Sequence, residues 1–153
     1  MDKSLINLRQ STDNDRNYLI NTWLRSYREH STWGFIHKMP EKQYNIRYRQ
    51  VILSILALPH VRVDIMTPAD DPELILGYAV TEPATLHYCH IKKAYQRLGL
   101  SKLLIGHLLD GRTVKYSHIT TPFQKAYKID SLPWEYCPYL ILGNSNLGDN
   151  EKG

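Results

Sequence analysis

The chain has 153 residues, of which 42% are hydrophobic and 22% are charged, and this composition is typical of one folded domain rather than of a low-complexity or collagen-like chain. No apolar run approaches the roughly 20 residues of a membrane-spanning helix, and the first residues lack the apolar core of a signal peptide. The net charge of +4 suits a phosphate-bearing ligand as well as it suits nucleic acid.

The chain has only two cysteines, Cys89 and Cys137. Two are too few for a disulfide scaffold, and their separation is not that of paired metal ligands. We therefore expect a reduced, cytoplasmic protein without a metal site.

Apolar alternation, helical repeats and turn residues divide the chain into helices and strands. Thr12 is expected to cap the first helix, with Asp15 as its partner, and Pro59 to end the second. Residues 31–40 are expected to be irregular. In chain order we expect a strand over 5–9, helices over 15–29 and 40–58, strands over 61–66, 74–82 and 85–92, a helix over 100–109, a strand over 114–120, a short helix over 122–128 and a strand over 136–142.

The order of these elements predicts an α/β (α+β) fold with a mixed, mostly antiparallel central sheet flanked by helices. Residues 61–92 form its antiparallel meander, because the turn at 67–73 is rich in Pro and Asp. The strictly alternating units of a dinucleotide-binding fold fit this order badly. We expect one domain over residues 1–143 and a flexible tail over 144–153.

Residues 90–105 carry the most informative pattern, in which a strand runs through a short turn into an amphipathic helix. A helix N-terminus presents unsatisfied N–H groups and a partial positive charge, so it binds phosphate well. Gly99 would let the backbone approach an anion closely, and Ser101 would add a hydroxyl. The pattern fits a pyrophosphate site and also fits an ordinary strand–helix connection.

The segment Gln96-Arg97-Leu98-Gly99-Leu100-Ser101 resembles the signature of the GNAT superfamily of N-acyltransferases. That signature is Gln or Arg, two variable residues, Gly, one variable residue, and then Gly or Ala. The chain departs from the family at Ser101 and at Arg97, where Gly is common. With the order of elements, the resemblance covers about residues 5–142.

The resemblance implies acetyl-CoA as cosubstrate, bound where the fourth and fifth strands splay apart. The backbone from Ile91 onward would pair with the pantetheine arm, and the turn after it would wrap the pyrophosphate. The residues expected to hold the cosubstrate are Ile91, Gln96, Arg97, Leu98, Gly99, Leu100 and Ser101.

Some details also resemble small acetyltransferase-like proteins of phages and prophages. They are the segments Trp23-Leu24-Arg25-Ser26-Tyr27, Ile75-Leu76-Gly77-Tyr78, His87-Tyr88 and Cys137-Pro138-Tyr139-Leu140.

The resemblance implies a tyrosine that protonates the leaving thiolate, in the helix after the fifth strand. Tyr127 is the best positional match. It could equally be a tyrosine packed under the last strand, and Tyr116, Tyr136 and Tyr139 remain alternatives as the acid.

The general base candidates are Glu82, at the end of the third strand of the core, and His87 and His90 on the fourth. Strand alternation places the two histidines on opposite faces, so only one of them can face the cleft. A strand histidine is more often packed or hydrogen-bonded than catalytic, although its ordinary pKa near 6.5 suits a base. The family transfers the acyl group directly, so a nucleophilic Cys89 is disfavoured.

The two N-terminal helices combine arginines with tyrosines and, in this family, wall the acceptor site. Such a surface can also bind nucleic acid, which we regard as the less favoured interpretation because tyrosines of this kind usually face the core.

We expect an N-acetyltransferase that acts on an amine, whether a small molecule or a protein. The alternatives are a non-catalytic module that binds CoA or a partner, and a phage-type modifier of nucleic acid or host protein. Members of this fold often form homodimers, and the sequence leaves the oligomeric state open.

Overall fold

The computed structural model describes residues 3–109, 114–118, 120, 123–125 and 134–142. Its helices are α1 (Arg16–His30), α2 (Gly34–Lys38), α3 (Glu41–Leu56) and α4 (Leu100–Leu109). Its strands are β1 (Ile6–Gln10), β2 (Arg62–Pro68), β3 (Gly77–Glu82), β4 (Thr85–Ile91), β5 (Lys115–Tyr116) and β6 (Glu135–Tyr136). Short 3₁₀ helices lie at Lys3–Leu5, Asp13–Asp15, Lys93–Tyr95 and Pro138–Leu142.

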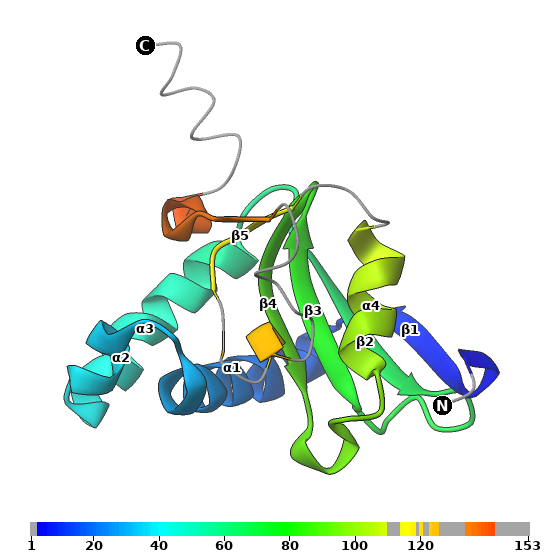
Figure 1. Cartoon of the computed structure of the whole chain (residues 1–153). Coiled ribbons are helices and arrows are strands. Elements are labelled where there is room, and N and C mark those ends of the chain that lie inside the picture. Colours follow the sequence, from blue (N-terminus) through cyan, green and yellow to red (C-terminus); the bar gives the residue numbers. More distant parts are fainter. Residues whose placement is uncertain (1–2, 110–113, 119, 121–122, 126–133, 143–153) are drawn as a thin grey trace.

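The strands form one sheet in the order β1-β2-β3-β4-β5-β6 (Figure 1). The first four strands pair in antiparallel fashion, whereas β5 runs parallel to both β4 and β6. The predicted α/β class, the meander over β2, β3 and β4 and the mostly antiparallel sheet are therefore confirmed.

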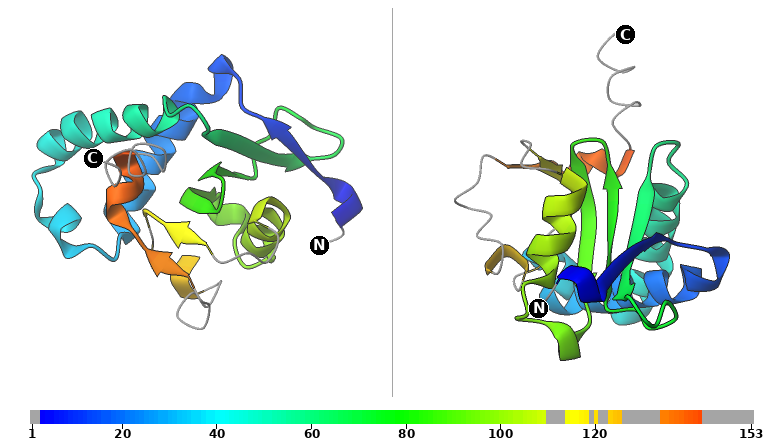
Figure 2. Two further views of the ribbon diagram at one scale, coloured as in Figure 1. Left: turned by 90° about the horizontal axis from the view of Figure 1, so that it is seen from above. Right: turned by 90° about the vertical axis from the view of Figure 1, so that its right-hand side faces the viewer.

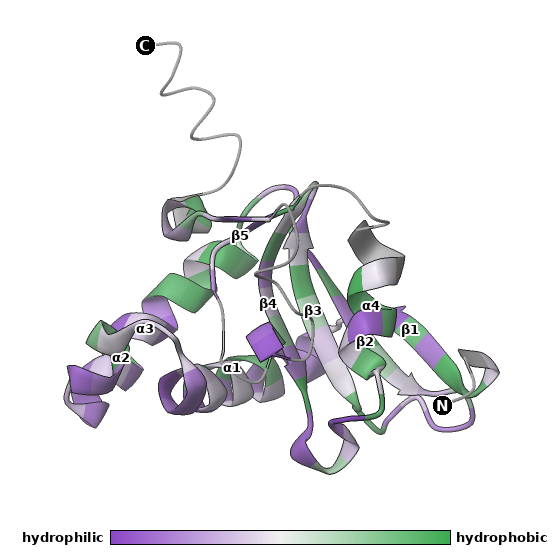
Figure 3. Cartoon of the chain, viewed as in Figure 1, coloured by the Kyte–Doolittle hydropathy of each residue, from purple (hydrophilic) through white to green (hydrophobic). Residues whose placement is uncertain are grey.

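Helices cover both faces of the sheet (Figures 1 and 2). Trp23 of α1 and Ile52 of α3 belong to the larger apolar core, which they share with residues of β2, β3 and β4. Leu100 and Leu104 of α4 belong to the second core, on the other face. Every residue of β3 is buried between these layers, and Figure 3 shows short hydrophobic segments of β3 and β4 interspersed with more polar ones. The middle strands are thus a rigid platform for any site at their ends.

The start of α1 differs from the sequence prediction in one respect, because Thr12 caps the 3₁₀ helix Asp13–Asp15, which leads directly into α1. The Thr12 backbone N–H donates to Oδ2 of Asp15 over 2.8 Å, as in a capping box. The guanidinium of Arg9, on β1, donates to both carboxylate oxygens of Asp15, at 2.8 and 3.0 Å. The cap is therefore also a link between β1 and α1.

The predicted last strand over 136–142 is wrong beyond Tyr136. The chain turns into a 3₁₀ helix at Pro138, and the Leu140 N–H donates to the Cys137 carbonyl over 3.0 Å. Proline has no N–H for a strand ladder, and its fixed φ suits a helical turn, so Pro138 ends the strand.

Three further bounds differ from the prediction. Residues 31–40 are not wholly irregular, because they contain α2. The strand expected over 74–82 begins only at Gly77. The strand expected over 114–120 is reduced to β5, and of the helix expected over 122–128 the structure describes residues 123–125, which are helical. No helix in the described part of the chain is long and apolar enough to cross a membrane.

Candidate active site

The sheet opens between β4 and β5. These strands pair only through Thr85 and Leu86, and the last hydrogen bond runs from the Ser117 N–H to the Leu86 carbonyl over 3.0 Å. Thr120 then forms an antiparallel bridge with Ser31, at the end of α1. The chain after β5 thus leaves β4, and among the described residues no strand pairs with this side of β4 beyond Leu86. The expected splay is therefore present.

A β-bulge lies where the sheet opens. Val80 of β3 pairs with Tyr88, whereas the next residue, Thr81, pairs with Leu86. His87 is therefore the extra residue of β4, and a bulge of this kind redirects a side chain and often lies beside an active site.

The structure brings Glu82 and His87 together. Oε1 of Glu82 lies 2.9 Å from Nε2 of His87, and both side chains are buried. Burial lowers the pKa of His87, and the hydrogen bond to Glu82 opposes this effect only partly. His87 is therefore neutral at pH 7, and its Nε2 shares a hydrogen bond with the carboxyl group of Glu82.

The same network continues beyond His87 to three side chains that the sequence did not single out. Nδ1 of His87 lies 2.7 Å from Oγ of Ser117, which lies 2.8 Å from Nδ1 of His118. Nε2 of His118 bonds in turn to the hydroxyl of Tyr48, on α3. Burial, with His87 nearby, lowers the pKa of His118 to about 3.

Aromatic rings hold His118 in place. They contact its ring edge-on, with centroids 4.9 to 6.3 Å away, and belong to Trp23, Tyr27, Tyr48 and Tyr88. Tyr48 also stacks between Tyr27 and Tyr44. Because these tyrosines are buried, they offer no stacking platform to nucleic acid.

The turn after β4 is fixed by Gln96. Its side-chain amide donates to the Ile91 carbonyl over 3.0 Å and so closes the loop that contains the 3₁₀ helix Lys93–Tyr95. Arg97 and Gly99 then adopt φ values of 67° and 77°. Arg97 thus occupies a conformation that favours glycine, at the position where GNAT sequences commonly have one.

Helix α4 begins directly after this turn. The N–H groups of Leu100, Ser101 and Lys102 precede the first intrahelical donor and have no partner within the helix. A Cβ added to Gly99 would meet no atom within 4 Å, so the backbone is open there to an incoming group. Leu100 is buried and anchors the helix, whereas Arg97, Leu98 and Gly99 are exposed. A pyrophosphate fits this arrangement of N–H groups, open glycine and basic side chains.

Known structures share this architecture. Bacillus subtilis YycN, a proposed acetyltransferase, matches with a TM-score of 0.62 and 14% identity over 82% of this chain and 88% of its own. A proposed acetyltransferase of Clostridium difficile 630 matches with a TM-score of 0.54 and 12% identity over 87% and 92%. The chain has the GNAT acetyltransferase fold.

Other matches are more distant. The spermidine N-acetyltransferase of Vibrio cholerae, in complex with CoA and spermine, matches with a TM-score of 0.42 and 16% identity over 84% of this chain and 68% of its own. No protein-family model and no curated protein matches the sequence.

Two other candidates on β4 lie in unfavourable surroundings within this GNAT fold. Burial raises the pKa of the Cys89 thiol to about 12, so Cys89 is not a thiolate at neutral pH. Burial, with Arg25 and Lys92 nearby, lowers the pKa of His90 to about 4. His90 also contacts the ring of Tyr78 rather than the network.

The expected acid, Tyr127, lies outside the described residues. Of the alternatives, Tyr136 stacks on Tyr116 with ring centroids 5.3 Å apart, and burial raises its pKa to about 12. The Tyr139 hydroxyl donates to Sγ of Cys137 over 3.3 Å.

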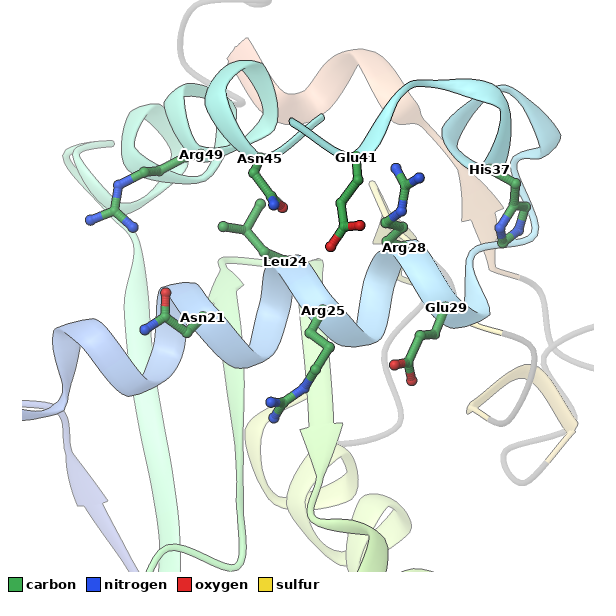
Figure 4. A pocket seen from close by; sticks show the side chains of 9 residues that line it. All are labelled: Asn21, Leu24, Arg25, Arg28, Glu29, His37, Glu41, Asn45 and Arg49. Carbon is green, nitrogen blue, oxygen red and sulfur yellow. The ribbon is translucent and has the colours of Figure 1, made fainter. Parts of the chain in front are cut away.

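A separate pocket of about 640 Å³ lies between α1, α2 and α3 (Figure 4). Eight of the nine residues that line it are polar or charged, and the nine are Asn21, Leu24, Arg25, Arg28, Glu29, His37, Glu41, Asn45 and Arg49. Nη1 of Arg28 is buried there without a hydrogen-bond partner, and the guanidinium carbon lies 5.3 Å from the centre of the Tyr44 ring. The pocket shares no residue with the buried network or with the turn before α4.

Within the described residues no group of three or more His, Cys, Asp or Glu side chains could hold a metal ion. The sequence analysis did not predict that Ser117, His118 and Tyr48 belong to this network. Tyr48 and His118 lie 70 residues apart, so no local pattern links them. The sequence offered one indication of their role, namely that Ser117 and His118 lie in the strand expected over 114–120, next to the strand that contains His87.

Proposed function

We propose that this protein is an acyl-CoA-dependent N-acetyltransferase that moves the acetyl group of acetyl-CoA directly to an amine. The observation that carries the proposal is the turn before α4, where the open backbone at Gly99 and the free N–H groups of the helix lie next to the unpaired side of β4. This arrangement suits a ligand with a pyrophosphate at one end and an extended polar arm at the other.

The arm would lie along β4. The Lys92 N–H donates to the Leu76 carbonyl over 2.9 Å, on the β3 side. Backbone groups alternate in direction along a strand, so those of Ile91 point to the open side. Gln96 already occupies the Ile91 carbonyl, which leaves the Ile91 N–H for the pantetheine arm. The pyrophosphate would then meet the backbone of Arg97, Leu98, Gly99, Leu100 and Ser101.

Acetyl-CoA supplies the thioester whose carbonyl carbon the amine attacks. The amine must first lose a proton, and Glu82 with His87 provides a buried carboxylate–imidazole pair at the opening of the sheet. The high pKa of Cys89 argues against a covalent acyl-cysteine and favours direct transfer. Tyr127 remains our proposal for the acid that protonates the thiolate.

One observation favours a second candidate, a GNAT-fold module that binds CoA or a partner without turnover. His87 is 0% and Glu82 5% exposed, so an acceptor amine reaches neither side chain directly in this structure. Acceptor-dependent release of CoA separates the two candidates, because a binding module releases none.

Calorimetry with acetyl-CoA, CoA and a nucleotide control tests the cosubstrate. We expect a Kd in the micromolar range, about −8 kcal/mol. Gly99→Glu should abolish binding because it places a carboxylate against the pyrophosphate. Gly106→Glu is the matched control, since it adds the same charge to an open position of the same helix. Equal affinity of wild type and Gly99→Glu would remove this turn from the site.

A further inference from the structure

The pocket between α1, α2 and α3 contains none of the residues assigned to the proposed transferase site, and its two main walls are facing helices (Figure 4). One wall is a face of α1, with lining residues spaced by three or four from Asn21 to Glu29. The other is a face of α3, with lining residues spaced by four from Glu41 to Arg49. A volume of about 640 Å³ is that of a small-molecule site.

Arg28, on the α1 wall, is half-buried and lacks a hydrogen-bond acceptor. Its guanidinium carbon lies 5.3 Å from the centre of the Tyr44 ring, and this cation–π contact holds the group in place. A guanidinium has five N–H donors, and in the described part of the chain none of those of Arg28 has an acceptor, although Nη1 is buried. Because the protein covers Nη1, a ligand would bond to Nε and Nη2.

The charges that line the pocket are unbalanced. Arg25, Arg28 and Arg49 contribute three positive charges, and Glu29 and Glu41 contribute two negative ones, which leaves one positive charge before any contribution from the histidine. Figure 4 shows Arg28 and Glu41 extending into the same space from α1 and α3. Among the described residues no ion pair joins any two of these five side chains, and Glu29 pairs with a histidine outside the pocket. The excess of positive charge favours a ligand with an anionic group.

The other lining groups suit a polar ligand. Asn21 on α1 and Asn45 on α3 each present a carboxamide, which both donates and accepts hydrogen bonds, and neither bonds to another described residue. Leu24 is the one apolar residue of the described lining. An apolar ligand would leave the carboxamides without partners, whereas a ligand with hydroxyl groups would satisfy them.

We propose that this pocket binds a small hydroxylated molecule through a carboxylate or phosphate group, which Arg28 holds. Nε and Nη2 of a guanidinium present two N–H bonds side by side, and both anions offer two oxygens that match them. Arg25 and Arg49 would add longer-range attraction that salt weakens, and Glu41 would oppose the anion. This site does not depend on the proposed transferase function.

NMR titration of the ¹⁵N-labelled protein tests the proposal, with the backbone amide signals of α1 and α3 as the readout. The probes are inorganic phosphate and acetate, then glucose 6-phosphate and gluconate, which carry the same two anionic groups on a hydroxylated body. We expect saturable shifts with a Kd in the millimolar range or below for the last two, weaker binding of the bare anions, and none of uncharged glucose. Saturation by only one of the last two identifies phosphate or carboxylate as the group that is bound.

Arg28→Gln removes the guanidinium and should weaken binding about tenfold or more. Arg47→Gln is the matched control, because it removes one positive charge from an exposed side chain of α3 that does not line the pocket, and the Kd should stay within about twofold of wild type. Glu41→Gln removes an opposing negative charge and should strengthen binding about twofold to threefold. Thermal melts show whether each variant folds, and Glu41→Gln keeps the test decisive if Arg28→Gln does not.

The absence of a saturable shift with all four anions overturns the site, as does an equal Kd in wild type and a folded Arg28→Gln. Glucose that binds as tightly as glucose 6-phosphate also overturns it, because the anion would then contribute nothing. Gly99→Glu should abolish acetyl-CoA binding and leave these titrations unchanged. Loss of anion binding in Gly99→Glu would place the anion at the turn before α4 instead, and failure of acetyl-CoA to bind wild type would end the transferase proposal alone.

Discussion

Oε1 of Glu82 and Nε2 of His87 lie 2.9 Å apart at the point where β4 and β5 separate, and neither side chain reaches solvent to any useful extent. A carboxylate is seldom buried so far unless it is paired. Burying the two polar side chains costs free energy on folding, and the hydrogen bond between them offsets this cost. Changes that break the hydrogen bond or alter the protonation of the pair should therefore affect both stability and catalysis.

Stability should fall in acid because the buried histidines resist protonation. The pKa of His118 is about 3 in the folded protein, against about 6.5 in an unfolded chain. The unfolded state therefore binds more protons below pH 6.5, and the free energy of unfolding decreases as the pH falls from there toward 3. Each fully titrating histidine contributes a slope of up to about 1.4 kcal/mol per pH unit.

Urea unfolding between about pH 3 and 8 measures this slope. His118→Phe keeps an aromatic ring in the cluster and removes one titrating group, so its stability should be lower at pH 7 but vary less with pH. Parallel curves for the two proteins would contradict the assignment of the acid sensitivity to His118.

Arg97→Gly should stabilise the fold. Arg97 adopts φ 67°, a conformation that costs a side chain about 1–2 kcal/mol and costs glycine nothing. Glycine has greater conformational entropy in the unfolded chain, and this offsets part of the stabilisation. We therefore expect a net increase of about 0.5–1 kcal/mol in the free energy of unfolding. The exposed neighbour Leu98 has no positive φ, so Leu98→Gly should destabilise. Denaturant titrations that rank the two variants the other way would show that the turn is not strained at Arg97.

Most of the fold could be predicted from the sequence because local patterns determine its elements. The leucines of helix α4 repeat with helical spacing, and the bounds that this spacing predicts, 100–109, are those observed, Leu100–Leu109. The prediction of the last strand is wrong because the local pattern there is ambiguous. The apolar segment after Pro138 is compatible with a strand or a helical turn, and only the missing N–H of the proline distinguishes them.

The site was only partly accessible from the sequence. Glu82 and His87 were each candidates, but their contact depends on the bulge in β4, which no local pattern shows. The link from His118 to Tyr48 joins the segment after β5 to α3 and exists only once the sheet and the helices have packed. The turn at Gly99, by contrast, was recognisable because a phosphate site at a helix N-terminus is local in sequence.

Gly77→Ala should be strongly destabilising. A Cβ at this position would lie 2.5 Å from the His90 carbonyl oxygen and 2.6 Å from Cδ1 of Ile91, and the first of these atoms is backbone in a paired strand. Relief requires β3 and β4 to move apart, at a cost of about 1–3 kcal/mol or more. Gly106→Ala is the control, because its Cβ meets nothing and a helix favours alanine by up to about 1 kcal/mol. Thermal melts should therefore shift in opposite directions, and equal shifts would contradict the close approach of β3 and β4.

Glu82→Gln tests the proposed chemistry most directly. Glutamine keeps the shape of the side chain and its hydrogen bond to Nε2 of His87. The amide cannot take up a proton, and kcat should therefore fall by roughly 10²–10⁴-fold while acetyl-CoA affinity stays close to that of wild type. The amide also buries an N–H₂ group without a ready partner, which should cost about 1–3 kcal/mol of stability.

Glu73→Gln is the control, at an exposed carboxylate in the turn before β3, and it should change neither kcat nor stability. CoA-release assays and thermal melts on both variants separate the two effects. Wild-type turnover in Glu82→Gln would show that the amine loses its proton without Glu82, and positioning of the amine and thioester would then supply the rate.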